Sequence, residues 1–321
     1  MQLLEDLEDR GFPTEYLLSR IRGRRAHLIT DWRPLIADVS LLEYLSSSRY
    51  RGFVTDRSPD GIWKSLLREF RWVYSQMNRS LRGIFTPFFL YSELKTLFLC
   101  LRFLKNKKAG RSDEILSVSM LSENMKKVLK GSQDITSAAA GIERLFLSLS
   151  SGFQGLAEDI DPLGLRGIEQ RLPHRYLVHI MQSDPHPLLK VFFIRLIDSR
   201  NIMSLYKYLM LEAENVPSFI PFGSIAETRL TEALDKHTSS GIASMIHRLT
   251  GITVDVADMT RVENALYRGI TRFLRKAGKD PLGIGLLLDY LWRCSIEAMN
   301  LSLLLYGRDL ERDAMTEELI Q

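Results

Sequence analysis

Apolar residues recur at intervals of three and four along most of the chain, which is the spacing of one face of an α-helix. In residues 62–77, for example, Leu66, Phe70 and Val73 fall on one such face. The same pattern predicts helices over residues 16–29, 141–149, 175–181, 188–211, 240–250, 261–276 and 282–306. Residues 251–256 alternate as a strand would, but so short a segment is equally compatible with an extended connection. The sequence therefore predicts an all-helical protein.

Turn and cap residues indicate where some of these helices begin. Residues 184–187, Asp-Pro-His-Pro, predict a turn before the helix that starts near Leu188. Asp280 followed by Pro281 predicts the N-cap and the first residue of the last long helix.

Two segments have the composition of connections between domains. Residues 106–113 are charged and contain a glycine, and residues 215–224 contain two prolines and a glycine. Their spacing of about 100 residues is too long for a solenoid repeat and suits domains of ordinary size. We therefore expect three helical repeat domains, over residues 1–110, 111–218 and 219–321.

Each expected domain has one polar residue beside an apolar helical stretch, and these residues are Glu93, Asn201 and Asn300. They correspond when residues 91–97, 199–205 and 298–304 are aligned. A buried amide must satisfy its donors and acceptors, and so fixes how its helix meets a neighbour. Chance similarity between amphipathic helices is the alternative explanation. The repeat predicts a packing role for these positions rather than a catalytic one.

No arrangement of catalytic residues stands out in the sequence. It has no G-x-x-x-x-G-K-[ST] phosphate loop and no G-x-S-x-G elbow, and its six histidines are scattered. Cys100 and Cys294 lie far apart in apolar helical stretches and are expected to be buried thiols. We therefore expect no catalytic residue, no cofactor and no metal. An unrecognised helical enzyme with a pocket between domains is the competing hypothesis.

The net charge is +4, and basic residues cluster at positions 20–25, 105–111 and 126–130. Solvated helix faces explain such clusters best, and docking onto an acidic protein or anionic headgroups is an alternative. Nucleic-acid binding is not expected, because no binding signature accompanies the charges. The acidic segment 1–9 is unlike a signal peptide, and no apolar stretch reaches the roughly 20 residues of a membrane span. We expect any membrane association to be peripheral.

Four short motifs follow one another along the chain. Residues 16–22 read Tyr-Leu-Leu-Ser-Arg-Ile-Arg, and residues 91–97 read Tyr-Ser-Glu-Leu-Lys-Thr-Leu. Residues 197–202 read Ile-Asp-Ser-Arg-Asn-Ile, and residues 290–307 contain Tyr, then Glu-Ala-Met-Asn-Leu, then a closing Gly. Together they resemble the motifs of the C-subunit family of V/A-type (vacuolar/archaeal-type) ATPases and ATP synthases, whose eukaryotic members are known as the d-subunit.

The resemblance singles out a set of candidate motif residues. They are Tyr16, Arg20, Arg22, Glu93, Asp198, Asn201, Gly223, Tyr290, Glu297, Asn300 and Gly307. Three positions depart from the family pattern: Glu93 stands where Asn is usual, Ser302 where Arg is usual and Ser19 where Ala is usual. The departures put the role of those side chains in doubt, but not the fold.

The resemblance implies three similar helical-bundle domains in a funnel-like, pseudo-threefold arrangement, and a role without catalysis. Such a protein belongs to the central stalk, caps the membrane proteolipid (rotor) ring and receives the lower end of the shaft. It couples ATP hydrolysis or synthesis to transmembrane transport of protons or sodium ions. A helical adaptor or scaffold protein outside a rotary ATPase is the alternative.

The same resemblance implies the partners and the location of the chain. The expected partners are the proteolipid ring and the central-shaft subunits, in a hetero-oligomeric complex that holds this chain as a monomer. No nucleic acid and no small-molecule substrate are expected, and the protein would lie peripherally on the cytoplasmic face of the membrane. The apolar-rich segments 216–222 and 86–89 are expected to be turns, which either contact partners or lie within a domain interface.

Overall fold

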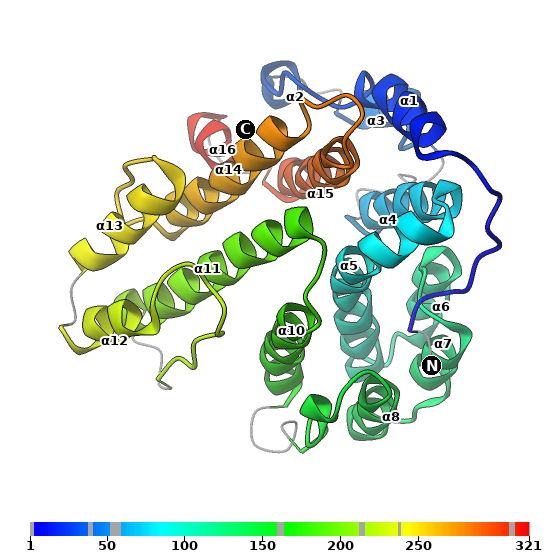
Figure 1. The fold of residues 1–321 in the computed structure, drawn as a ribbon, viewed down its shortest axis with the longest axis horizontal. Helices are drawn as coiled ribbons and strands as arrows, with labels where there is room; N and C mark the ends of the chain where they lie inside the picture. Colours follow the sequence, from blue (N-terminus) through cyan, green and yellow to red (C-terminus); the bar gives the residue numbers. More distant parts are fainter. Residues whose placement is uncertain are drawn as a thin grey trace. The chain divides into compact units, whose positions relative to one another are not determined.

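The computed structural model describes residues 3–37, 41–51, 59–158, 164–211, 216–236, 239–307 and 312–320. Within these residues the regular structure is helical, which confirms the predicted all-helical class (Figure 1). An isolated antiparallel bridge joins Leu4 to Leu121. Residues 251–256 form an extended connection and a turn, the second of the two structures that the sequence allowed. The funnel of three domains stays a prediction.

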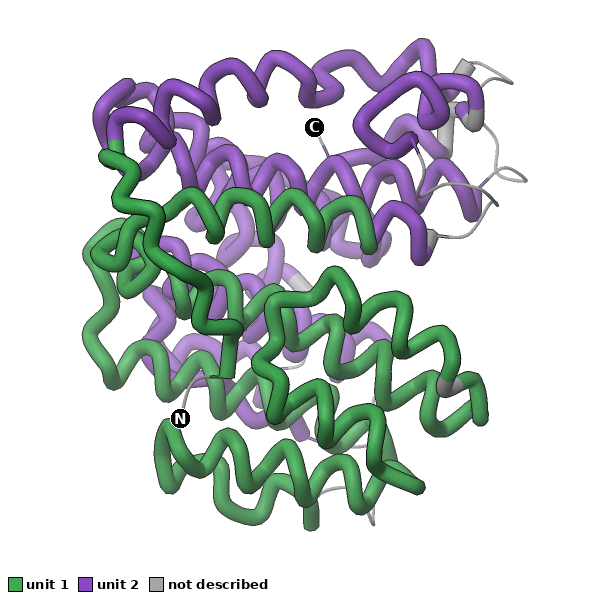
Figure 2. Tube along the Cα trace, turned by 90° about the vertical axis from the view of Figure 1, so that its right-hand side faces the viewer, with its two compact units in different colours: residues 1–14, 64–189 green, residues 15–63, 190–321 purple. Residues whose placement is uncertain are grey.

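The chain forms two compact units, which Figure 2 shows in different colours. The first unit comprises residues 1–14 and 64–189. Its helices are most of α4 (Pro59–Gln76), then α5 (Arg79–Lys105), α6 (Ala109–Val118), α7 (Glu123–Gly131), α8 (Ile135–Leu147), the short 3₁₀ helix η1 (Ser151–Phe153) and α10 (Leu165–Gln182). α5 is the central element, because α6, α7, α8 and α10 all pack against it. Phe70 and Tyr74 of α4 meet the ring of Phe89 in α5 edge to face, with centroids 5.8 and 5.1 Å away.

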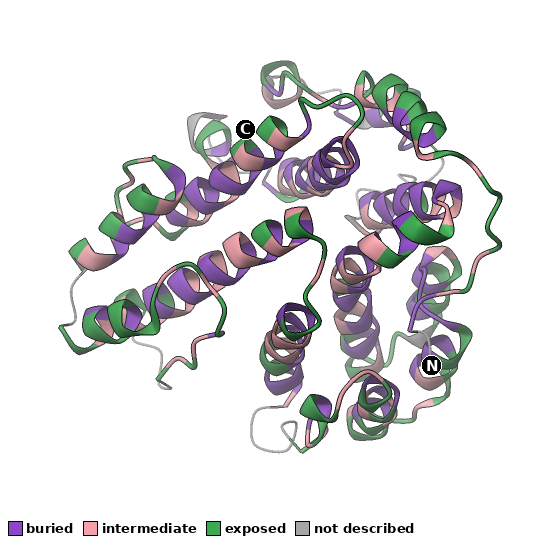
Figure 3. Cartoon of the chain, in the orientation of Figure 1, coloured by how far each residue is buried: buried purple, intermediate pink, exposed green. Residues whose placement is uncertain are grey.

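The second unit comprises residues 15–63 and 190–321. Its helices are α1 (Thr14–Arg25), α2 (Arg33–Ala37), α3 (Leu41–Ser47), most of α11 (Pro187–Met210), α12 (Glu227–Asp235), α13 (Ser239–Thr250), α14 (Met259–Ala277), α15 (Gly285–Tyr306) and α16 (Arg312–Glu318). α14 packs against α13, α15 and α16. α15 is buried along most of its length (Figure 3), which explains why its sequence is apolar on nearly every face.

The expectations for residues 106–113 and for Asp280 are wrong, and α10 begins ten residues before the helix expected at residues 175–181. Residues 106–113 are not a linker, because α6 begins at Ala109 and folds back against α5. Asp280 does not cap α15, which begins only at Gly285. Instead, the Asp280 carboxylate accepts a hydrogen bond from the amide of Leu282 at 3.0 Å and forms a turn. The turn predicted at residues 184–187 is present between α10 and α11, and Asp184 has a positive φ of 47° there.

The described residues include three pairs of consecutive long helices. They are α4 and α5 (18 and 27 residues), α10 and α11 (18 and 24) and α14 and α15 (19 and 22). Glu93, Asn201 and Asn300 each lie in the second helix of a pair, as its fifteenth, fifteenth and sixteenth residue. The residues that the sequence aligns therefore occupy equivalent positions on equivalent helices.

Among the described residues, α5 is long and apolar enough to cross a membrane, with 56% of its most apolar 18-residue window buried. Buried core helices of soluble proteins meet the same criterion. α5 also buries Arg82 and Glu93, and other helices of its unit cover it. Since an ionisable residue facing lipid is costly and these two face protein, we assign α5 to the core.

Candidate functional site

Asn201 and Asn300 each hold a later segment of the chain by the same two hydrogen bonds. Nδ2 of Asn201 donates to the carbonyl of Ile220 (2.9 Å), and Oδ1 accepts from the amide of Ile220 (2.8 Å). Asn300 makes the same pair with Ile320, at 2.9 and 3.0 Å. Both asparagines are buried. A side-chain amide thus satisfies one buried residue's backbone donor and acceptor at once.

Glu93 occupies the corresponding place in α5, but a carboxylate has no N–H to donate. Its oxygens accept from the Met120 amide (2.6 Å) and the Ser119 hydroxyl (2.9 Å). The carbonyl of Met120 accepts instead from the amide of Glu5, at 2.8 Å. The N-terminal segment therefore supplies the donor that an asparagine supplies in the other two places, and this accommodates the departure at Glu93.

Side chains of the first unit fix the N-terminal segment in this position. The Glu5 carboxylate, 11% exposed, pairs with Arg71 and Lys126, each at 2.6 Å. The Arg82 guanidinium donates to the backbone carbonyls of residues 7 and 8. The donor that replaces an asparagine is therefore held by several charged contacts.

Glu93→Gln is expected to gain stability relative to the wild type as pH rises. Burial raises the pKa of Glu93, although the hydrogen bond from Met120 opposes the rise. A carboxyl with a raised pKa binds its proton more tightly in the folded state. Wild-type stability therefore falls by up to about 1.4 kcal/mol per pH unit as pH rises. The fall begins at about pH 4.3, the usual pKa of glutamate, and ends at the raised pKa of Glu93 in the folded protein.

Glutamine does not titrate, so the difference in stability should move in favour of Glu93→Gln across this window. Urea unfolding of both proteins between about pH 4.5 and about pH 8 measures that difference. A difference that stays constant over this range would contradict the burial of an ionisable Glu93.

Asp198 lies one turn before Asn201 and binds the residues that lead into α12. Its carboxylate accepts from the Ser224 hydroxyl (2.6 Å) and from the Ile225 amide (3.1 Å). Gly223 passes so close that a Cβ at this position would collide with the Asp198 carboxylate, which is a physical reason for a glycine there. Burial raises the pKa of Asp198, and the two hydrogen bonds oppose that rise.

Glu297 lies one turn before Asn300, as Asp198 lies before Asn201. Its Oε1 accepts from the Tyr50 hydroxyl (2.7 Å) and from Arg49 (2.5 Å), and its Oε2 accepts from the Ile29 amide (2.7 Å). Burial and the Glu297 carboxylate raise the pKa of Tyr50 well above its usual value, so the hydroxyl keeps its proton and donates. The C-terminal motif thereby anchors two parts of the N-terminal region.

Residues of the first motif, 16–22, also make contacts within the second unit. The Arg20 guanidinium lies over the ring of Tyr16, 5.6 Å from its centroid. Arg22 donates to a backbone carbonyl in the turn between α14 and α15. Arg25, which no motif singles out, pairs with the buried carboxylate of Asp289 at 2.9 Å.

The two remaining motif residues are Tyr290, in α15, and Gly307, directly after it. Tyr290 is 1% exposed. Gly307 is the C-cap, and its amide donates to the carbonyl of Leu303 at 2.7 Å. The motif residues thus lie at separate junctions and do not converge on one catalytic centre. Glu93 lies in the first unit, and the others lie in the second.

A family model described as ATP synthase (C/AC39) subunit matches residues 17–318. The chain belongs to this family. The match includes every motif residue except Tyr16, so the family that the four motifs indicate is confirmed. Among curated proteins, none matches the chain.

In this member of the ATP synthase (C/AC39) family, several anchoring residues carry no sequence signal of their own. Nδ2 of Asn264 donates to the carbonyls of Glu317 (3.0 Å) and Glu318 (2.9 Å), and Arg268 donates to that of Leu319 (3.2 Å). Their i, i+4 spacing on α14 is the one available hint, and it is common to all amphipathic helices. Arg49 and Tyr50 also have no signal in the sequence, because only the fold brings them to Glu297.

The buried ionisable groups offer little free chemistry. Glu93, Asp198 and Glu297 all accept hydrogen bonds from backbone amides. Cys100 and Cys294 are buried free thiols, as expected, and burial raises the pKa of Cys100 to about 12, which makes it a poor nucleophile. In the described part of the chain, no group of His, Cys, Asp and Glu residues could hold a metal ion.

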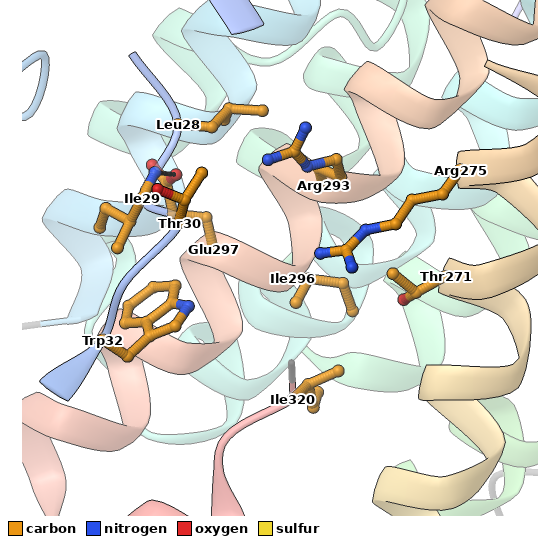
Figure 4. A pocket seen from close by; sticks show the side chains of 10 residues that line it. All are labelled: Leu28, Ile29, Thr30, Trp32, Thr271, Arg275, Arg293, Ile296, Glu297 and Ile320. Carbon is orange, nitrogen blue, oxygen red and sulfur yellow. Dashed lines mark hydrogen bonds between the residues drawn. The ribbon is translucent and has the colours of Figure 1, made fainter. Parts of the chain in front are cut away.

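In the described part of the chain, cavities open on the second unit, and two of them have charged side chains in their lining. The larger, of about 530 Å³, lies along α11, α12 and α13 and is lined by apolar residues together with Arg195, Arg229 and Arg248. The smaller, of about 220 Å³, lies between the N-terminal region and α14 and α15 (Figure 4).

Proposed function

We propose that this chain is the non-catalytic coupling subunit of a V/A-type rotary ATPase. It would connect the central shaft of the soluble sector to the proteolipid ring, on the cytoplasmic face of the membrane. Membership of the ATP synthase (C/AC39) subunit family carries the proposal. ATP chemistry would then reside on other subunits, and proton or sodium ions would move through the ring.

The way in which the buried polar groups are used supports this role. A part that transmits torque must resist deformation, and close-packed helices with fixed junctions do so. Asn201, Asn300 and Glu93 each fasten a segment 19–27 residues further along the chain. Asp198 and Glu297 fasten further segments from the same helices. The carboxylates thus stiffen the protein.

Exposed apolar residues at the end of α11 and in the segment that follows it along the chain are candidates for contact with a partner. In the described residues, Met210, Leu211, Val216 and Phe222 are four of the ten large apolar side chains that are exposed. Phe222 is 45% exposed and has a φ of 71°, a conformation that costs an aromatic residue of order 1 kcal/mol. An exposed aromatic held in a strained turn is suited to contact a partner.

The other segment expected to be a turn, residues 86–89, is not one, because it lies inside α5 with Phe88 and Phe89 buried.

Co-purification tests the proposal. A tagged wild-type chain should recover the proteolipid ring and the shaft subunits from detergent-solubilised membranes at low salt. A chain that recovers neither would overturn the proposed function.

Two variants of Phe222 test the contact surface separately. Phe222→Asn should raise or preserve thermal stability, because Asn tolerates positive φ, and should lower recovery of a partner several-fold. Phe222→Tyr keeps the ring and is the matched control. Full recovery of both partners by Phe222→Asn would exclude this surface and leave the proposed function standing.

A further inference from the structure

The smaller cavity contains two arginines that no carboxylate of the described chain pairs with. Figure 4 shows Arg275 of α14 and Arg293 of α15 pointing into it from neighbouring helices. Thr271 and the ring of Trp32 form parts of its wall. Within the residues that the structure describes, neither arginine makes a hydrogen bond or an ion pair.

The neighbouring acids form no ion pair with Arg275 or Arg293 in the described chain, although the charge of Asp289 acts on both arginines. Both oxygens of Glu297 accept hydrogen bonds, and the carboxylate of Asp289 is paired with Arg25. Burial lowers the pKa of Arg293; Asp289 opposes this effect, whereas the positive charges of Arg25 and Arg275 add to it. The cavity therefore has an excess of positive charge, which an anion would neutralise.

We propose that this cavity binds a phosphate group through Arg275 and Arg293. A guanidinium presents paired N–H donors that match the spacing of phosphate oxygens. The hydroxyl of Thr271 accepts the indole N–H of Trp292 at 2.8 Å, so its own hydrogen is directed elsewhere and can donate to the same oxyanion. Phosphate binding here does not depend on the proposed coupling role, although the anchor Glu297 also lines the cavity.

The volume of the cavity limits the ligand. A cavity of about 220 Å³ is smaller than the roughly 300–1,000 Å³ of sites that enclose drug-sized molecules. It is nevertheless several times the roughly 30 Å³ that one water occupies in the liquid. One phosphate with some of its water fits, whereas an enclosed nucleotide does not. The group would come from free phosphate or from a phospholipid headgroup at the opening.

Titration calorimetry with inorganic phosphate, at constant ionic strength, tests the site in the purified full chain. The wild type should bind phosphate, and the Arg275→Gln/Arg293→Gln double variant should bind at least about tenfold more weakly. Lys276→Gln removes one charge from the next position of α14, which does not line the cavity, and should bind as the wild type does. If the double variant does not fold, Arg275→Gln alone replaces it in this test, because Arg275 is exposed, and it should also bind phosphate more weakly than the wild type.

Vesicles of phosphatidylcholine with and without phosphatidic acid distinguish the two sources. A headgroup ligand predicts that only the vesicles with phosphatidic acid retain the wild type, and that free phosphate competes. A free ion predicts calorimetric binding with no such retention. Equal phosphate binding by wild type and double variant, or none by either, overturns the proposal.

Discussion

Replacing Glu297 by alanine is expected to destabilise the protein by about 3–5 kcal/mol, a larger loss than we expect from any other single substitution. The carboxylate is 3% exposed and accepts from Tyr50, Arg49 and the amide of Ile29. Alanine leaves a largely buried guanidinium and a backbone N–H without their acceptor. Urea unfolding followed by circular dichroism measures the loss, and Glu297→Gln should lie between alanine and wild type, because it retains one acceptor.

A second carboxylate of the same unit provides the control. Glu317 pairs with Arg261 at 2.6 Å, but their side chains are 59% and 47% exposed. Exposed pairs contribute little, so Glu317→Ala should cost less than about 1 kcal/mol. Equal losses for Glu297→Ala and Glu317→Ala would show that Glu297 is not a buried anchor.

Asn201→Ala is expected to cost about 2–4 kcal/mol, because it removes both hydrogen bonds to Ile220 and leaves its amide and carbonyl without partners. Ile220 is only 7% exposed, so water replaces those bonds poorly. Hydrogen exchange provides a local measurement: the Ile220 amide should lose protection while the core of α15 keeps its own.

Two further variants sharpen this prediction. Asn201→Asp keeps an acceptor for the amide but places a carboxylate against the carbonyl of Ile220, so it should also destabilise. Lys207→Ala changes an exposed residue on the same helix and should leave exchange at Ile220 unchanged. Unaltered protection of Ile220 in Asn201→Ala would contradict the role of this amide.

Helical periodicity predicts the all-helical class and eight of the helices, because burying one face of each helix requires a 3.6-residue repeat. It does not predict others, such as α7 and α12. The correspondence of Glu93, Asn201 and Asn300 is readable for a related reason: a polar residue in an otherwise apolar stripe stands out. The residues that these three side chains hold do not stand out. Met120, Ile220 and Ile320 bind them through backbone atoms, which every residue possesses.

Boundaries between elements were less predictable. Asp280-Pro281 has the local chemistry of a helix start, yet the chain makes a turn there and α15 begins at Gly285. Residues 106–113 have the composition of a linker, yet α6 uses most of them. In both cases tertiary packing overrides a local preference. The replacement of an asparagine donor by the Glu5 amide depends on a contact distant in sequence, and no local pattern could indicate it.

In the proposed function, this chain couples the soluble sector to the proteolipid ring and catalyses nothing itself. The direct measurement compares ATP hydrolysis by the soluble sector with ATP-driven ion pumping in vesicles, in a complex depleted of this chain. The proposal predicts that hydrolysis persists, that pumping is lost, and that adding the purified chain restores pumping. Loss of hydrolysis from the isolated soluble sector, or pumping that continues without the chain, would contradict it.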